Sequence, residues 1–180
     1  MRTTFVTLLC AAALLAACTP AKDRRSFGTV IDDQAVEIKV IDVLYSRPEF
    51  GDADHIKAEA HDSTLLLAGE VSSEANRALA GQLAAQLKTV DRVVNELEVM
   101  PAADTGGRFN NAYLTSKVNT KLTTANPVEG FDAGRIKVVT AHGNVYLMGT
   151  VSRAEGDAVA DIVRHTRGVK KVVKVFDYTD

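Results

Sequence analysis

Three residues at four-residue spacing in the C-terminal half could bind a negatively charged surface. Tyr113, Lys117 and Lys121 fall on one side of a predicted helix, because residues four apart are neighbours on a helix surface. An aromatic ring suits the carbonyl layer of a lipid interface, and lysine ammonium groups can reach phosphates. The pattern predicts a binding surface for anionic phospholipid, with Leu114 beside it. The alternative is that Tyr113 packs against the preceding linker and that the lysines only face solvent.

Residue types that support catalysis or metal binding lack the spacing that either chemistry needs. Ser72 and Ser152 are predicted to cap helices, because their turns do not form a nucleophile elbow. Gly69 and Gly149 are predicted to be structural, at strand ends that approach a helix or form a bulge. The histidines show no pairing at metal-ligand spacing on a common helix or hairpin; they are His55, His61, His142 and His165. We therefore predict no catalytic residue, no metal site and no cofactor.

The elements that must position these residues are written twice in the chain. Residues 65–72 (LLLAGEVS) recur as residues 145–152 (VYLMGTVS), at an offset of 80. Upstream, the offset is 78: Val36, Lys39, Val40 and Leu44 match Leu114, Lys117, Val118 and Leu122. Because the order of the matches is preserved, we predict two homologous domains.

Each copy predicts the same series of elements. In the second copy, Leu114, Val118 and Leu122 form one apolar helix face, which ends before Pro127. Strands are expected at 136–140 and 145–151, joined by a Gly/Asn turn that favours antiparallel pairing. Ser152 and Glu155 have capping-box spacing for a second helix, and a last strand is expected at 169–176. The prediction is an α+β fold of two tandem α-β-β-α-β units, each with a three-stranded sheet and two helices on one face.

The N-terminal residues predict a secretion signal with a lipid attachment site. Arg2 precedes an apolar run that is too short to span a bilayer. The sequence Leu-Ala-Ala-Cys at 15–18 resembles the lipobox of bacterial lipoproteins, which implies cleavage and acylation of Cys18. Because Thr19 and not Asp follows, the resemblance implies sorting to the outer membrane. The expected organisation is 1–17 signal peptide, 18–26 lipidated Cys and tether, 27–100 first domain, 101–109 linker and 110–180 second domain.

Charge is distributed unevenly between the two copies. The whole chain carries a formal net charge of −2 and only 6% aromatic residues, which argues against a nucleic-acid binder. Residues 26–103 contain 6 Lys/Arg against 14 Asp/Glu, whereas residues 110–180 contain 10 against 7. Only the second copy therefore suits an anionic surface.

The repeated unit, with a strand that ends in Gly-x-Val-Ser, resembles the BON-domain family of bacterial envelope proteins, and the preceding lipobox is similar to its dual-BON outer-membrane lipoproteins. The resemblance implies a non-enzymatic protein on the periplasmic side of the outer membrane, which binds phosphatidylglycerol or cardiolipin and supports envelope integrity. An alternative is an adaptor whose acidic first domain docks to an outer-membrane assembly protein. A hydrolase of envelope polymers has little support, because a compact three-stranded unit offers few clefts.

Overall fold

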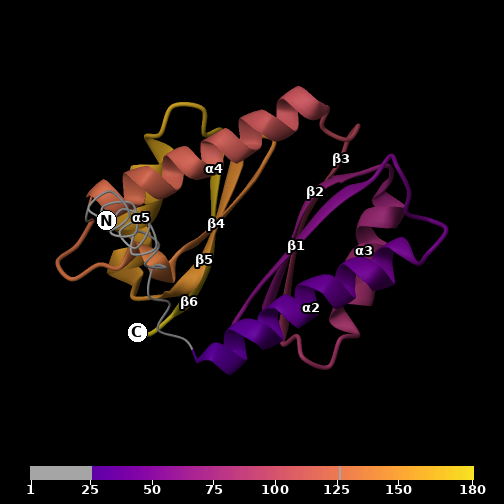
Figure 1. The fold of residues 1–180 in the computed structure, drawn as a ribbon, viewed down its shortest axis with the longest axis horizontal. Coiled ribbons are helices and arrows are strands. Elements are labelled where there is room, and N and C mark those ends of the chain that lie inside the picture. Colours follow the sequence, from indigo (N-terminus) through magenta and orange to yellow (C-terminus); the bar gives the residue numbers. More distant parts are fainter. Residues whose placement is uncertain (1–25, 126) are drawn as a thin grey trace, which may run out of the picture.

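In the computed structural model, which describes residues 26–125 and 127–180, each repeat forms a three-stranded sheet with two helices on one face (Figure 1). The elements of the first repeat are α2 (Phe27–Tyr45), β1 (His55–His61), β2 (Thr64–Val71), α3 (Glu74–Ala85) and β3 (Arg92–Val99). Those of the second are α4 (Thr105–Ala125), the 3-10 turn η1 (Ala133–Arg135), β4 (Lys137–Ala141), β5 (Asn144–Val151), α5 (Arg153–Arg164) and β6 (Lys171–Tyr178). The predicted α+β fold is confirmed.

The two sheets have the same topology. The first strand of each repeat pairs antiparallel with the second, and the second pairs parallel with the third. The central strands are therefore β2 and β5. Helix α4 begins at Thr105, so the segment expected to be the linker, 101–109, ends inside that helix. The predicted signal peptide (1–17), Cys18 and residues 19–25 of the predicted tether lie outside the described residues, whereas Ser26, its last residue, caps α2.

A hydrophobic core lies between the helices and the sheet of each repeat. The first helix of each repeat buries the apolar stripe that the sequence predicts, Val36, Val40 and Leu44 on α2 and Leu114, Val118 and Leu122 on α4. These six side chains are the ones that match at an offset of 78. The buried positions of the repeat thus direct both helices onto their sheets in the same way.

A third core joins the two repeats, because the faces of the sheets that carry no helices pack against each other (Figure 1). Its buried members are Leu66, Ala68, Val139, Ala141, Tyr146, Met148 and Val175. All eight residues of β2 are consequently buried. The molecule has four layers, with helices outside and the two sheets inside.

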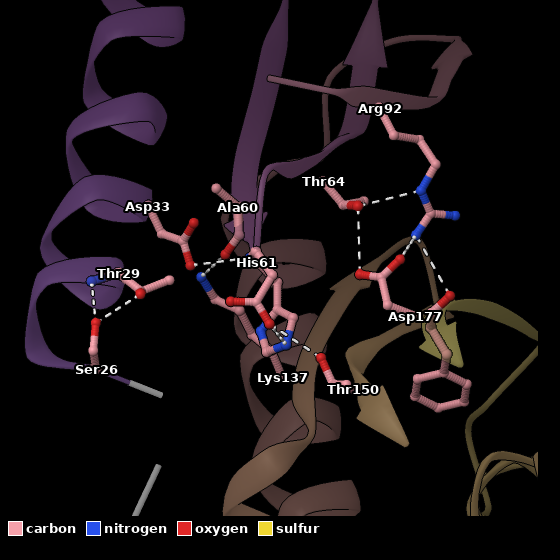
Figure 2. A network of polar contacts seen from close by, with 12 residues as sticks. Ser26, Thr29, Asp33, Ala60, His61, Thr64, Arg92, Lys137, Thr150 and Asp177 are labelled. Atoms are coloured by element: carbon pink, nitrogen blue, oxygen red, sulfur yellow. Dashed lines mark hydrogen bonds and ion pairs between the residues drawn. The ribbon is translucent and has the colours of Figure 1, made fainter. Parts of the chain in front are cut away.

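Polar contacts around this third core are reciprocal. The ammonium group of Lys57 donates to the carbonyl oxygen of Thr140 at 2.8 Å. That of Lys137 donates to the carbonyl oxygen of Ala60 at 3.3 Å (Figure 2). These four residues are two matched pairs of the repeat at an offset of 80. The interface is therefore organised like that of a symmetric dimer, in which each surface contacts its own equivalent.

Ion pairs strengthen the same interface unequally. Lys137 lies between Glu37 and Glu59 of the first repeat, with N–O distances of 2.5 and 2.7 Å. Burial alone would lower the pKa of Lys137, but its bonds to these two carboxylates outweigh burial and raise the pKa. Burial prevails at the matching Lys57 and lowers its pKa, although Glu70 and Glu59 oppose the shift. At the sheet edge, Arg92 pairs with Asp177 at 2.7 Å (Figure 2).

The two glycines that match between the repeats have a structural role, but for a different reason from the one expected. Gly69 and Gly149 have φ values of +126° and +149°. A Cβ at these positions would lie 2.1 Å from the carbonyl oxygen of His55 and 2.3 Å from that of Arg135. The close neighbour is thus the backbone of the segment beside the glycine, at the first residue of β1 for Gly69 and at the last residue of η1 for Gly149, and not a packed α-helix.

The prediction of the helix-capping serine is correct in only one of the two repeats. Ser152 caps α5, and Glu155 completes the capping box. In the first repeat, the cap of α3 is Ser73, so the prediction for Ser72 is wrong. The hydroxyl and the N–H of Ser72 instead donate to the carboxylate of Asp54, at 3.0 and 2.8 Å. Burial alone would raise the pKa of Asp54, but these bonds, with those from Gly51 and Asn76, lower it.

Candidate functional site

The candidate site lies on α4, which covers the outer side of the second sheet (Figure 1). The helix starts where the carboxylate of Asp104 accepts a hydrogen bond from the N–H of Gly107 at 2.7 Å. Its buried face carries Asn111, Leu114, Val118 and Leu122. The opposite side of α4 is therefore turned away from the core and is available to a ligand.

Two aromatic rings stand on the exposed side of α4. Tyr113 is 66% exposed and Phe109, one turn earlier, is 72% exposed. The exposure of Tyr113 disfavours the alternative in which its ring packs against the linker. We call Phe109, Tyr113, Lys117 and Lys121 the α4 ridge, since they follow one another at four-residue steps.

The lysines of the α4 ridge bend toward the carboxyl end of α5. The ammonium group of Lys117 donates to the carbonyl oxygen of Arg167 at 2.8 Å. That of Lys121 donates to Ile162 and His165, at 3.3 and 3.2 Å. Cations are favourable there because helix C-terminal carbonyls carry partial negative charge. The lysines are thus held in place by the neighbouring helix, which the sequence pattern did not indicate.

The positive charges of the ridge are not neutralised by a carboxylate. Within residues 26–125 and 127–180, neither Lys117 nor Lys121 forms an ion pair. Both lysines are half-buried, and Arg167, whose carbonyl oxygen accepts the bond from Lys117, is exposed. The ridge therefore presents two rings beside uncompensated positive charge.

The predicted site residues are only partly at this surface. Leu114 is 3% exposed and belongs to the second core, so it anchors the helix and offers no surface for a ligand, in contrast to its expected place among the contact residues. Sequence reasoning missed Phe109, which it assigned to the linker, and the bond from Lys117 to the carbonyl oxygen of Arg167. The four-residue spacing of Phe109 and Tyr113 was the signal that could have revealed the first.

The matching side of α2 has a different chemistry. The residues at the positions of Tyr113, Lys117 and Lys121 are Ala35, Lys39 and Val43. At these three positions, the first repeat therefore has no aromatic residue and only one of the two cations.

A buried carboxylate forms a second polar cluster between the repeats. Glu70, which is 1% exposed, contacts Nδ1 of His55 at 3.0 Å and Nε2 of His142 at 2.6 Å. It links β2 to the hairpin turn of the second repeat and so belongs to the interface. In the described ranges, no group of three or more His, Cys, Asp or Glu side chains is arranged to hold a metal ion. Among the same residues, no helix has the length and apolar character to cross a bilayer.

Comparison with known proteins gives a match to both repeats. The model of the BON domain matches residues 32–101 and residues 110–180. The chain is 33% identical over 160 residues to the outer membrane lipoprotein DolP of Haemophilus influenzae, a match that covers 89% of this chain and 81% of DolP. It is 31% identical to the 21 kDa hemolysin of Actinobacillus pleuropneumoniae, with 87% and 79% covered. It is 30% identical to the osmotically inducible protein Y of Escherichia coli, with 81% and 72% covered.

Proposed function

The chain belongs to the BON-domain family, and on that premise we propose that it is a non-enzymatic outer-membrane lipoprotein that binds anionic phospholipid. The α4 ridge of the second BON domain makes the contact, on the periplasmic side of the membrane. Through this contact the protein supports the integrity of the envelope.

The N-terminal sequence and the relatives support the lipoprotein part of this proposal. Cys18 follows Leu-Ala-Ala in the arrangement of a lipobox, and the relative from Haemophilus influenzae is named an outer membrane lipoprotein. Several acyl chains would hold the protein on the membrane, because each buried CH₂ contributes about 0.8 kcal/mol.

The observation that carries the lipid part is the pairing of exposed rings with unneutralised lysines on one helix. Aromatic rings favour the membrane–water interface, and each lysine near an anionic surface contributes about 1 kcal/mol. These contributions are small for a free protein. They suffice for an anchored one, since the tether keeps the local concentration of lipid high.

Vesicle binding by a soluble form that starts after Cys18 tests the proposal. The protein is expected to sediment with phosphatidylglycerol or cardiolipin vesicles and not with phosphatidylcholine vesicles. Lys117→Gln with Lys121→Gln is expected to weaken binding by about thirty-fold, which corresponds to about 2 kcal/mol for two charges. Glutamine keeps an N–H donor without the charge, so the variant removes the positive charges while the side chains stay polar.

A matched variant separates a local effect from one of net charge. Lys39→Gln with Lys88→Gln removes the same charge from exposed positions in the first repeat and is expected to bind as the parent does. Equal binding by the α4 variant and the parent, or equal losses in both variants, would show that the α4 ridge is not the contact.

A further inference from the structure

Helix α2 carries an unexplained apolar surface on its outer side. Ile38 is 72% exposed, Ile31 is 48% exposed and Tyr45 is 40% exposed. They are seven residues apart and so lie on one side of the helix, with the half-buried Ile41 beside them. We call these four residues the α2 stripe. It extends for about 20 Å, at 1.5 Å per residue.

The second repeat shows that the fold does not require this surface. At the offset of 78, the counterparts of Ile38, Ile41 and Tyr45 on α4 are Ser116, Asn119 and Thr123, whereas that of Ile31 is the exposed Phe109 of the α4 ridge. Both helices bury the same three matched positions on their sheets. Since α4 packs in the same way with polar residues at the positions of Ile38, Ile41 and Tyr45, packing on the sheet does not require the exposed side chain of Ile38.

The α2 stripe has a defined shape. A shallow hollow of about 700 Å³ is lined by Glu37, Ile38, Ile41, Asp42, Tyr45 and Ser46. The hydroxyl of Tyr45 donates to the carbonyl oxygen of Asp54 at 3.1 Å and accepts from the N–H of Ile56 at 3.2 Å. These two bonds fix the ring at one end of the hollow, so little side-chain entropy is lost when a partner covers it.

The charge around the α2 stripe selects the kind of partner. The exposed Asp42 lies on one side of the stripe, and Glu37, which pairs with Lys137, lies on the other. The first repeat as a whole has 14 acidic residues against 6 Lys/Arg. An anionic membrane is therefore repelled. A protein segment with apolar side chains and flanking Lys or Arg is complementary in both respects.

We propose that the α2 stripe docks an amphipathic, basic segment of another protein. Apolar side chains of the segment cover Ile38 and Tyr45, and its cations face Asp42. Helices α2 and α4 form the two outer layers of the molecule (Figure 1). The partner can therefore bind on one side while the α4 ridge faces lipid on the other. The docking stands independently of the lipid contact.

Site-specific photo-crosslinking in cells, with the full lipidated chain, tests this proposal. Gln34 is exposed between Ile31 and Ile38, so a photoreactive benzoylphenylalanine at position 34 reports on the stripe. Mass spectrometry of the adduct is expected to identify a protein segment in which Lys or Arg flanks apolar residues. The same probe at position 112, the matched exposed position on α4, is expected not to capture that segment.

Two further variants decide whether the stripe makes the contact. Ile38→Ser introduces the residue that α4 carries at the matched position, and Asp42→Lys reverses a charge. Each is exposed, so the melting temperature is expected to stay the same while the adduct from position 34 falls at least ten-fold. The adduct is expected to persist in the variant of Lys117 and Lys121. Adducts only with phospholipid, with a second copy of this chain or with its own N-terminal segment would overturn the proposal, as would the absence of any adduct.

Discussion

Gly69 and Gly149 show how a single residue sets the spacing of two strands. Each has positive φ and faces a backbone carbonyl that a Cβ would strike, at 2.1 and 2.3 Å. The carbonyl of His55 belongs to the paired strand β1, and that of Arg135 belongs to the turn η1 that leads into β4, so neither can move without shifting its backbone segment. Alanine at either position is therefore expected to lower the free energy of unfolding by about 2 kcal/mol or more.

Urea denaturation of Gly149→Ala measures this effect. Gly51→Ala is the matched control, because its Cβ would meet no atom within 4 Å. The control is expected to change stability by less than about 0.5 kcal/mol. A midpoint for Gly149→Ala equal to that of the control would refute the steric explanation.

At the scale of the element, α5 depends on charge at its first turn. Glu155 accepts a hydrogen bond from the N–H of Ser152 at 2.8 Å and pairs with Arg135. Burial alone would raise the pKa of Glu155, but these contacts prevail and lower it from 4.5. A carboxylate with a lowered folded pKa stabilises the fold above its unfolded pKa, and this stabilisation is lost as the pH falls through the folded pKa.

Glu155→Gln is accordingly expected to lower the free energy of unfolding at neutral pH by about 1 kcal/mol. The difference from the parent should shrink as the pH falls below the ordinary pKa of 4.5 and should vanish below the lowered folded pKa, where the parent carboxylate is also protonated. Thermal unfolding followed by circular dichroism across this range measures both effects. Glu74→Gln, at an exposed position in the first turn of α3, is the control and should leave the curve unchanged. If the parent and Glu155→Gln still differ in stability at low pH, the charge of Glu155 is not the source of the stabilisation.

The order of the elements could be predicted from the sequence, because each pattern of apolar and turn residues occurs in both repeats and the two copies can be compared. The error at Ser72 arose where the copies differ: Ser152 has Glu155 three residues later, whereas Ser72 has Ala75. The missing capping-box glutamate could be seen in the sequence. The role of Asp54 as the partner of Ser72 could not, since 18 residues separate them.

The candidate site could be predicted only in part for the same reason. Helical spacing placed Tyr113 and the lysines on one side of a helix. The carbonyls of α5 that hold Lys117 and Lys121 lie 41 to 50 residues away, and no local pattern indicates such contacts. Phe109 was left out of the predicted site because the glycines at 106 and 107 suggested a linker. In the structure, Asp104 caps the helix ahead of these glycines.

For the whole molecule, the decisive feature is the third core between the sheets. The continuous apolar runs of β2 and β5 are typical of strands buried on both faces, so this signal was present in the sequence. The matched lysines, Lys57 and Lys137, then cross the interface in opposite directions. Each sheet thus covers the helix-free face of the other. Because a repeat of this size has only a small core of its own, the two repeats should unfold together.

Leu66→Ala tests whether the repeats are one cooperative unit. Leu66 is fully buried in the third core, and its truncation is expected to cost about 2 to 5 kcal/mol. If the repeats are coupled, hydrogen exchange should accelerate in β5 and β6 of the second repeat as well as in β2. Leu83→Ala, in the first core alone, should perturb α3 most directly, and Ile38→Ala, at an exposed position, should perturb neither repeat. Faster exchange confined to the first repeat in Leu66→Ala would mean that contact between the sheets does not couple the unfolding of the two repeats. Helices α2 and α4 would then be free to move independently.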